Sequence, residues 1–220
     1  MIKLINVNMC DLDISKIANL SHGIKRNWYE TRTEEELNRD KKLLFQLWDW
    51  GHLSVFEFLQ MAFFVKVPIF TARQWQRHRT GRYLEKSLRY TKVKNAVFSF
   101  EGCYKNNKLD KITYAKVDSI YKQVLKTYEM LIEEGMKPEE AREILPLGLY
   151  TEFYWQIDAR NLYNFLRLRL SKHAQEDIRQ NAQQILDELS KHPKTKNLYQ
   201  LYINSLSKEE DINELLNKDN

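Results

Sequence analysis

A run of mostly apolar residues, FLQMAFFVKV at positions 58–67, is predicted to form a buried strand. Pro68 follows this run directly, and proline suits the first turn of a helix because its missing N–H would have no partner there. The sequence therefore predicts a strand that leads at once into a helix, from Pro68 to about Arg79. A strongly basic segment begins on that helix. The residues after the strand are therefore candidates for a functional site.

Helices dominate the rest of the pattern. Alternating apolar and polar residues predict two further strands, at 2–8 and 151–157. Residues 80–95 are expected to form a loop with some extended structure. Amphipathic spacing predicts helices at 12–20, 34–50, 110–134, 139–145, 159–170, 175–191 and 197–206.

Local residues mark several ends of these helices. Thr33 and Glu36 have the spacing of a capping box, and Gly51 can end the helix that they begin. Gly135 can end the long helix before it, and Asp158 is a plausible N-cap for the helix that follows.

Length and composition favour one compact domain over residues 1–207, followed by a polar tail over residues 208–220. The 220 residues include only 6 Gly and 4 Pro, and 43% are hydrophobic, which is enough for a sizeable core. No apolar run approaches the roughly 20 residues that a membrane span needs, and the N-terminus lacks a secretory pattern. Cys10 and Cys103 offer neither a disulfide framework nor metal-ligand spacing, so we expect a cytoplasmic protein without a metal site or a membrane partner.

The basic segment reads RQWQRHRTGRYLEKSLRY at residues 73–90. Seven Lys or Arg lie between residues 73 and 92, against a single acid, Glu85. Such a cluster repels itself unless an anion or water screens it. On the predicted helix, Arg73 and Arg77 share a face. The pattern favours a ligand with phosphates and polar rings, while a basic C-terminal turn on a surface helix remains the alternative.

Polar residues crowd a second segment, GHLSVFEF at residues 51–58. His52, Ser54 and Glu57 stand together at the entry to the predicted buried strand. A lone polar residue there is more often a cap or a satisfied core group. Three together indicate a weak functional candidate.

A third group lies on the predicted helix 159–170. Arg160, Asn164 and Arg167 fall on one face, and Arg169 lies about half a turn away from Arg160. One helix is thus able to offer polar groups to two ligands or subunits. The alternative is an amphipathic helix with arginines on its wet side.

Several familiar signatures are absent from the sequence. It contains no GxGxxG, no phosphate-binding P-loop, no HExxH and no zinc spacing. None of the three polar groups contains a cysteine, which disfavours a thiolate nucleophile.

With these residues in view, the chain resembles the flavin-dependent thymidylate synthases. Their signature is Arg-His-Arg, seven residues and then Ser, and here it reads Arg77-His78-Arg79, TGRYLEK and Ser87. Four further segments resemble the family in the same order: GHLSVFEF, VPIFTARQWQRHR, AREILPLGLYTEFYW and ARNLYNFLRLR-x3-HAQ. The resemblance spans about residues 51–176.

The resemblance implies an α+β fold with a mixed or antiparallel sheet core surrounded by helices. It also implies a homotetramer with active sites at the subunit interfaces. The implied enzyme is a methyltransferase that converts dUMP to dTMP with FAD as cofactor. Methylenetetrahydrofolate would donate the carbon and NADPH the reducing equivalents, which removes the need for a catalytic cysteine.

The resemblance also implies roles for individual residues. The catalytic positions are Arg169 and His52. The cofactor positions are Ser54, Arg77, His78, Arg79, Glu85, Asp158, Arg160 and Asn164. The nucleotide positions are Gln74, Arg77, Glu85, Ser87, Arg89, Arg142 and Arg169.

Elementary chemistry agrees with these roles. Arginine binds phosphate through two parallel hydrogen bonds. A guanidinium at Arg169 facing a pyrimidine would favour the ionised ring and make its C5 more nucleophilic. Backbone N–H groups around Ser87 would add to an anion site, and Ser87 lacks a neighbouring base that would activate it as a nucleophile.

Four positions depart from the family pattern. Arg82 and Leu84 replace the usual Ser and Asn of the spacer, Asp158 stands where Asn is more usual, and Gly148 follows ILPL where Asn is common. An alternative therefore keeps the fold and flavin but acts on another pyrimidine nucleotide or transfers a hydroxymethyl group. A non-enzymatic nucleic-acid-binding protein is the third alternative; it explains the net charge of +5 but leaves Glu57 and Glu85 without a role, so we expect no nucleic-acid partner.

Overall fold

The structure is a computed structural model that describes residues 1–93, 96, 98–99, 110–209 and 212. Cys103 and most of the predicted tail lie outside the described residues. The chain divides into two compact units. The first unit comprises residues 1–65, 78–83 and 154–220, and the second comprises residues 66–77 and 84–153.

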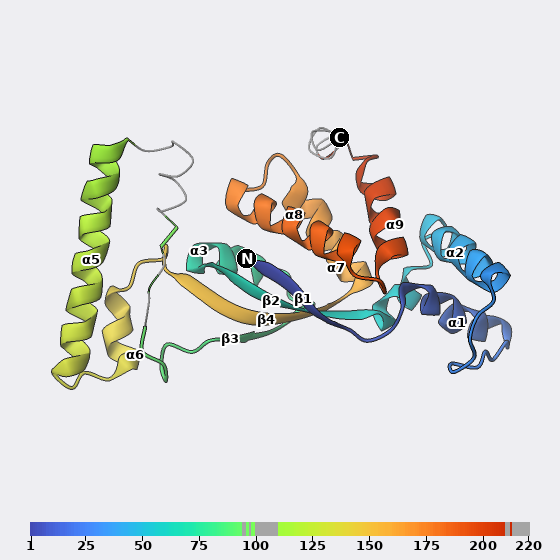
Figure 1. The fold of residues 1–220 in the computed structure, drawn as a ribbon, viewed down its shortest axis with the longest axis horizontal. Helices are drawn as coiled ribbons and strands as arrows, with labels where there is room; N and C mark the ends of the chain where they lie inside the picture. The colour runs from blue at the N-terminus through green and yellow to red at the C-terminus, as the bar shows by residue number, and fades with distance from the viewer. Residues whose placement is uncertain (94–95, 97, 100–109, 210–211, 213–220) are drawn as a thin grey trace. The chain divides into compact units, whose positions relative to one another are not determined.

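Four strands form one sheet in the order β1-β2-β4-β3 (Figure 1). β1 pairs with β2 in antiparallel fashion, with Ile2 opposite Val65 and Val7 opposite Met61. This sheet and the helices around it confirm the predicted α+β class. The strands are β1 (Ile2–Val7), β2 (Gln60–Pro68), β3 (Arg82–Glu85) and β4 (Tyr150–Asp158).

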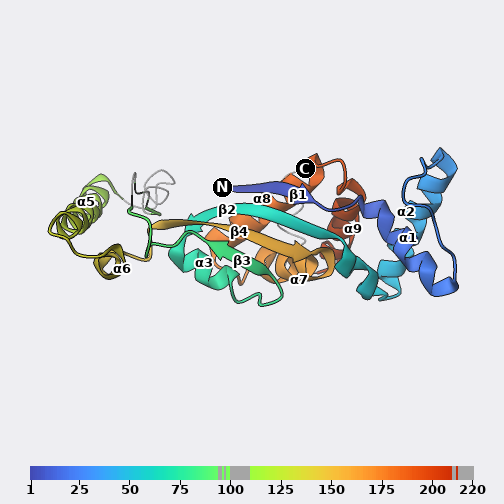
Figure 2. The ribbon, with the colours of Figure 1, turned by 90° about the horizontal axis from the view of Figure 1, so that it is seen from below.

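The core of the first unit lies between the sheet and two helices, α7 (Ala159–Leu170) and α8 (Glu176–Lys191). Both helices lie on the same face of the sheet in the two perpendicular views (Figures 1 and 2). Side chains on that face alternate with less buried ones because successive strand residues point to opposite sides. Its fully buried members include Met61, Phe63, Val65, Trp155 and Ile157.

The remaining elements of the first unit begin and end much as the local residues predict. The Thr33 side chain accepts from the N–H of Glu36, and Glu36 bonds back, which confirms the capping box. Gly51 adopts φ 74° after the helix, a conformation that glycine reaches without steric cost. The helices are α1 (Ile14–Asn19), α2 (Glu34–Asp49) and α9 (Lys196–Leu206), with short 3-10 turns at Asp11–Asp13, Leu20–His22 and Leu53–Phe58.

The second unit contains α3 (Ile69–Trp75), α5 (Lys111–Glu133), α6 (Pro138–Ala141) and a 3-10 turn at Arg142–Ile144. Asp110 caps α5 through the N–H groups of Ile112 and Thr113. Gly135, at φ 91°, follows the end of that helix as predicted. Within the described residues, no helix has both the length and the apolar character needed to cross a bilayer.

The helix predicted over 68–79 is too long. Pro68 is the N-cap of α3, and the helix ends at Trp75. The carbonyl of His78 accepts from the N–H of Gly81 and from the Tyr83 hydroxyl, so the chain turns here. The helical face that Arg73 and Arg77 were expected to share is therefore absent.

Candidate active site

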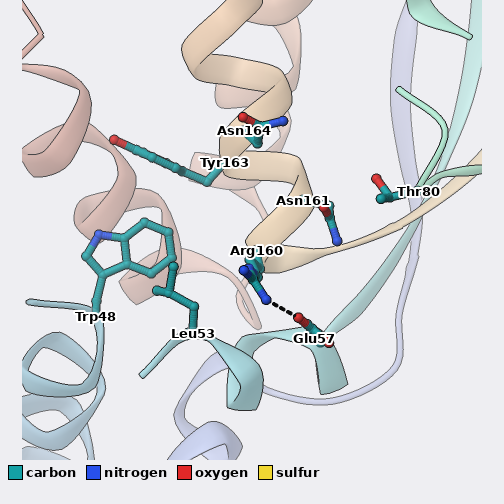
Figure 3. A pocket seen from close by; sticks show the side chains of 8 residues that line it. All are labelled: Trp48, Leu53, Glu57, Thr80, Arg160, Asn161, Tyr163 and Asn164. Carbon is teal, nitrogen blue, oxygen red and sulfur yellow. Dashed lines mark hydrogen bonds and ion pairs between the residues drawn. The ribbon is translucent and has the colours of Figure 1, made fainter. Parts of the chain in front are cut away.

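A pocket of about 800 Å³ opens in the first unit, beside the first turns of α7 (Figure 3). Residues from α2, the 3-10 turn before β2, the 78–83 turn and α7 form its wall. They are Trp48, Leu53, Glu57, Thr80, Arg160, Asn161, Tyr163 and Asn164. Arg160 and Asn164, which the family resemblance assigns to the cofactor, both line this pocket.

One side of the pocket is polar. Arg160 Nη1 lies 2.5 Å from Glu57 Oε1, and the two side chains are 49% and 45% exposed (Figure 3). An ion pair this exposed contributes little to stability. It can therefore be exchanged at small cost for the anionic group of a ligand.

The start of α7 supplies further polar groups to this side. Asp158 caps the helix by accepting from the N–H of Asn161, as predicted, and it also accepts from the side-chain amide of Asn161. The capping bonds orient Asn161 at the pocket. The cofactor role of Asp158 itself stays a prediction.

The other side of the pocket is aromatic. The rings of Trp48 and Tyr163 meet edge to face, with centroids 4.8 Å apart. Trp48 donates from its indole N–H to Ser205 Oγ at 2.9 Å, which fixes the ring. Burial raises the pKa of Tyr163, so its hydroxyl stays protonated. A flat ring system fits such a wall.

A buried histidine connects the 78–83 turn to the far end of α7. Arg169 Nε donates to His78 Nε2 at 2.9 Å. His78 is only 9% exposed, and Arg169 is half-buried. Burial, with the neighbouring Arg169 cation, lowers the pKa of His78 to about 4. The imidazole is therefore neutral at physiological pH.

Tyr83 holds the turn from the other side. Its hydroxyl donates to the carbonyl of His78 at 2.9 Å, and its ring stacks on that of Trp155 with centroids 6.5 Å apart. Burial raises the pKa of Tyr83 to about 12, so the hydroxyl remains a donor.

Gly81 occupies the tightest point of this turn. A Cβ at this position would lie 2.3 Å from Nε1 of Trp155, which is completely buried and cannot move aside. We expect Gly81→Ala to lower the free energy of unfolding by about 1–3 kcal/mol, the usual cost of overpacking. Urea denaturation of the purified variant measures this change.

Trp155→Phe provides the control for Gly81→Ala. Because it removes the indole nitrogen, its destabilisation should be smaller in the Gly81→Ala background than in the wild type. Strictly additive effects of the two substitutions would contradict the proposed clash.

In the second unit, Glu85 is held by two side chains. Its Oε1 accepts from Thr151 Oγ1 at 2.6 Å, and its Oε2 accepts from Gln76 Nε2 at 2.9 Å. Both carboxylate oxygens are thereby oriented on an exposed strand. The role of Glu85 as a cofactor and nucleotide contact stays a prediction.

Arg89 and Arg142, predicted as nucleotide contacts, meet at one acidic residue. Arg89 places Nε and Nη2 at 3.1 and 3.0 Å from Glu139 Oε2, and Arg142 Nε donates to the Glu139 carbonyl at 3.1 Å. The arginines lie far apart in sequence, yet together they offer a cationic site. An incoming phosphate would compete with Glu139 for it.

The other predicted residues have less defined surroundings. His52, Ser54, Arg77 and Arg79 are exposed, and Gln74 is partly buried. Ser87 Oγ accepts from the N–H of Arg89 at 3.3 Å, so the serine shapes the turn that carries this arginine. In the described part of the chain, no group of three or more His, Cys, Asp or Glu side chains is placed to hold a metal ion.

Sequence reasoning missed several partners that the structure gives to the predicted residues within each unit. Gln76 and Thr151 orient Glu85, Tyr83 supports the turn of His78, and Glu139 joins two arginines. Thr151 is separated from Glu85 by 66 positions, so no local pattern reveals the pair. The sequence indicated only that Thr151 lies on the buried face of β4, through the alternation of that strand.

Comparison with known proteins identifies the family of this chain. Residues 3–193 match the family described as thymidylate synthase complementing protein. The flavin-dependent thymidylate synthase of Thermosipho africanus is 39% identical over 194 residues, which cover 82% of both chains. A flavin-dependent thymidylate synthase of Thermus thermophilus is 38% identical over 196 residues, covering 84% of this chain and 70% of the relative.

A solved structure has the same fold. The UMP/dUMP methylase PolB from Streptomyces cacaoi, bound with 5-Br dUMP, superimposes with a TM-score of 0.76 at 25% identity. The match covers 92% of this chain and 94% of the other. The chain belongs to the thymidylate synthase complementing protein family, the family of the flavin-dependent thymidylate synthases. This membership confirms the predicted resemblance and the prediction of a methyltransferase enzyme.

Proposed function

We propose that this protein is a flavin-dependent thymidylate synthase that methylates dUMP to dTMP. FAD is the proposed cofactor, methylenetetrahydrofolate the carbon donor and NADPH the reductant. The observation that carries this proposal is the convergence of Arg160 and Asn164, both assigned to the cofactor by the resemblance, on one pocket of about 800 Å³.

The pocket residues fit a flavin dinucleotide. Trp48 and Tyr163 offer an aromatic wall to a ring system, while Arg160, Asn161 and Asn164 offer donors to phosphates and ring carbonyls. A bound flavin supplies the electrons that turn the transferred carbon into a methyl group. In this arrangement Glu57 releases Arg160 to an anionic group of the cofactor.

The chain's own residues then prepare the nucleotide. Arg89 and Arg142 bind its phosphate in exchange for Glu139, and Glu85 accepts hydrogen bonds from the sugar or base. Arg169 places its positive charge at the pyrimidine, which stabilises the ionised ring and raises the nucleophilicity of C5. In this proposal His52 contacts the carbon donor.

This mechanism requires no cysteine nucleophile. Burial raises the pKa of the Cys10 thiol, and Asp11 beside it acts in the same direction. The thiol is therefore protonated at neutral pH and unsuited to attack. In this proposal Arg169, and not Cys10, activates the substrate.

Two measurements on the purified protein test the proposal. The protein should show the visible absorbance of an oxidised flavin, and NADPH should bleach it. With dUMP and methylenetetrahydrofolate present, mass spectrometry should then detect dTMP. A protein that neither carries nor takes up FAD would refute the proposal.

A second candidate function keeps the fold and flavin but changes the nucleotide or the transferred group. Arg82 and Leu84, which depart from the family pattern, both lie on exposed β3 beside Glu85 and favour this candidate. The structural neighbour is also described as acting on UMP as well as dUMP. Parallel reactions with dUMP, UMP and dCMP distinguish the candidates, and dTMP as the sole product excludes the second.

A further inference from the structure

We propose that His78 is a positioning residue that holds the Arg169 guanidinium in the orientation that the pyrimidine ring requires. This inference rests on the proposed role of Arg169. The family resemblance assigns His78 to the cofactor, whereas the structure gives its ring a different partner. His78 acts as a neutral hydrogen-bond acceptor on the arginine.

The geometry of the pair carries the proposal. The bond from Arg169 Nε to His78 Nε2 is 2.9 Å long. A bond at Nε, rather than at a terminal nitrogen, fixes the plane of the guanidinium at its junction with the side chain. His78 and Arg169, from distant parts of the sequence, thereby set the orientation of the guanidinium.

The histidine ring is itself held in place. It packs against Phe165, with ring centroids 4.7 Å apart, and the residue is 9% exposed. Phe165 and Arg169 lie on successive turns of α7, so the ring contacts the same helix twice. A ring held in this way can orient a longer and more flexible side chain.

The backbone of His78 is equally constrained. Tyr83 donates to its carbonyl, Tyr83 stacks on Trp155, and Gly81 packs directly against the same indole. The turn is thus anchored to β4 within the first unit. The position of the imidazole is determined by these contacts before any ligand binds.

Only the neutral form of His78 can accept this bond. Among the described residues, the titratable side chains that hydrogen-bond to His78 are Arg169 of α7, at the ring, and Tyr83 of β3, at the backbone carbonyl. Burial and the arginine keep the pKa of His78 near 4, so its Nε2 lone pair is available at physiological pH. With Nε2 as acceptor, the ring proton lies on Nδ1.

A double-mutant cycle on the full-length, FAD-loaded protein tests the proposal. The variants are His78→Leu, Arg169→Ala and their combination, and the readout is the Kd for dUMP from titration without turnover. We expect His78→Leu alone to weaken dUMP binding by about tenfold, the loss of one charge-assisted hydrogen bond. In the Arg169→Ala background, the same change should alter Kd by less than about twofold.

A matched pair of conservative variants provides the second readout. Gln at position 78 can place an acceptor near the position of Nε2, whereas Asn reaches only as far as Nδ1. We expect His78→Gln to keep kcat within about fivefold of the wild type and His78→Asn to lose about tenfold or more. This pair remains decisive if His78→Leu does not fold.

The outcomes separate the inference from the proposed function. An equal loss from His78→Leu in both backgrounds, or equal activity of the Gln and Asn variants, overturns the positioning role. A variant that loses FAD affinity while dUMP binding is unchanged points to a direct cofactor contact and overturns it too. A wild-type protein that binds dUMP but forms no dTMP refutes the proposed function, while the coupling between residues 78 and 169 is still measured.

Discussion

Replacing Arg169 with alanine should leave the protein folded and flavin-bound but remove most of its dTMP-forming activity. The guanidinium is the cation that we place at the pyrimidine, where it stabilises charge that develops as C5 reacts. Removing such a group costs about 100-fold or more in kcat, or about 2.7 kcal/mol. Arg169 is half-buried near the end of α7, so its removal should cost the fold little.

The experiment compares steady-state kcat for dTMP with the visible flavin spectrum of the same preparation. Arg167→Ala is the matched control, because Arg167 lies exposed on the same helix and has no assigned role. It should retain activity within about twofold and an unchanged spectrum. Survival of the Arg169→Ala variant within about tenfold, or roughly 1.4 kcal/mol, would show that the substrate-activating role is wrong.

The largest effect on stability is expected at Asp40. This carboxylate on α2 is 3% exposed and lies between two guanidinium groups, with Arg26 Nη1 at 2.5 Å and Arg32 Nε at 2.9 Å. Arg32 also lies 2.5 Å from Asp13 and is itself 10% exposed. Asp40→Asn removes the charge and replaces one carboxylate oxygen with an NH2 donor that faces a guanidinium, while Arg26 keeps Glu36 and Arg32 keeps Asp13 as partners. The free energy of unfolding should fall by about 3–5 kcal/mol.

Denaturant unfolding of the Asp40→Asn variant checks this value through the shift in midpoint. Asp118→Asn is the matched control, because Asp118 forms the same kind of pair with Lys122 at 2.6 Å on an exposed helix surface. That change should cost less than about 1 kcal/mol. Equal losses from the two substitutions would mean that burial does not strengthen the Asp40 network.

The parts of the fold predicted correctly depend on neighbours in sequence. The Thr33 capping box, the Asp158 cap and the glycine after the long helix all formed as predicted. Each depends on hydrogen bonds between residues a few positions apart. The strands at 2–8 and 151–157 were likewise found because alternation is visible in any short window, and the strand at 58–67 was found because its residues form a mostly apolar run.

The errors lie where distant residues decide the local conformation. Helix α3 stops at Trp75, before the Arg-His-Arg segment, although the sequence pattern continues. The turn that replaces it depends on Trp155, which packs against Gly81 and Tyr83. The extended structure expected within residues 80–95 did form, as β3, but only its pairing within the sheet sets where this short strand begins and ends. No local pattern contains this information.

The candidate functional residues show the same division. Their types were evident in the sequence. An Arg-His-Arg cluster with one acid indicates a bound anion, and the ordered segments resemble one family. The sequence did not reveal the partners of these residues. The hydrogen bond between His78 and Arg169 joins residues 91 positions apart, and that between Glu85 and Thr151 joins residues 66 positions apart. Sequence patterning establishes which side chains are available and how nearby residues cap and turn the chain. Folding establishes which of them touch, since hydrogen bonds between distant residues form only when packing brings them within about 3 Å.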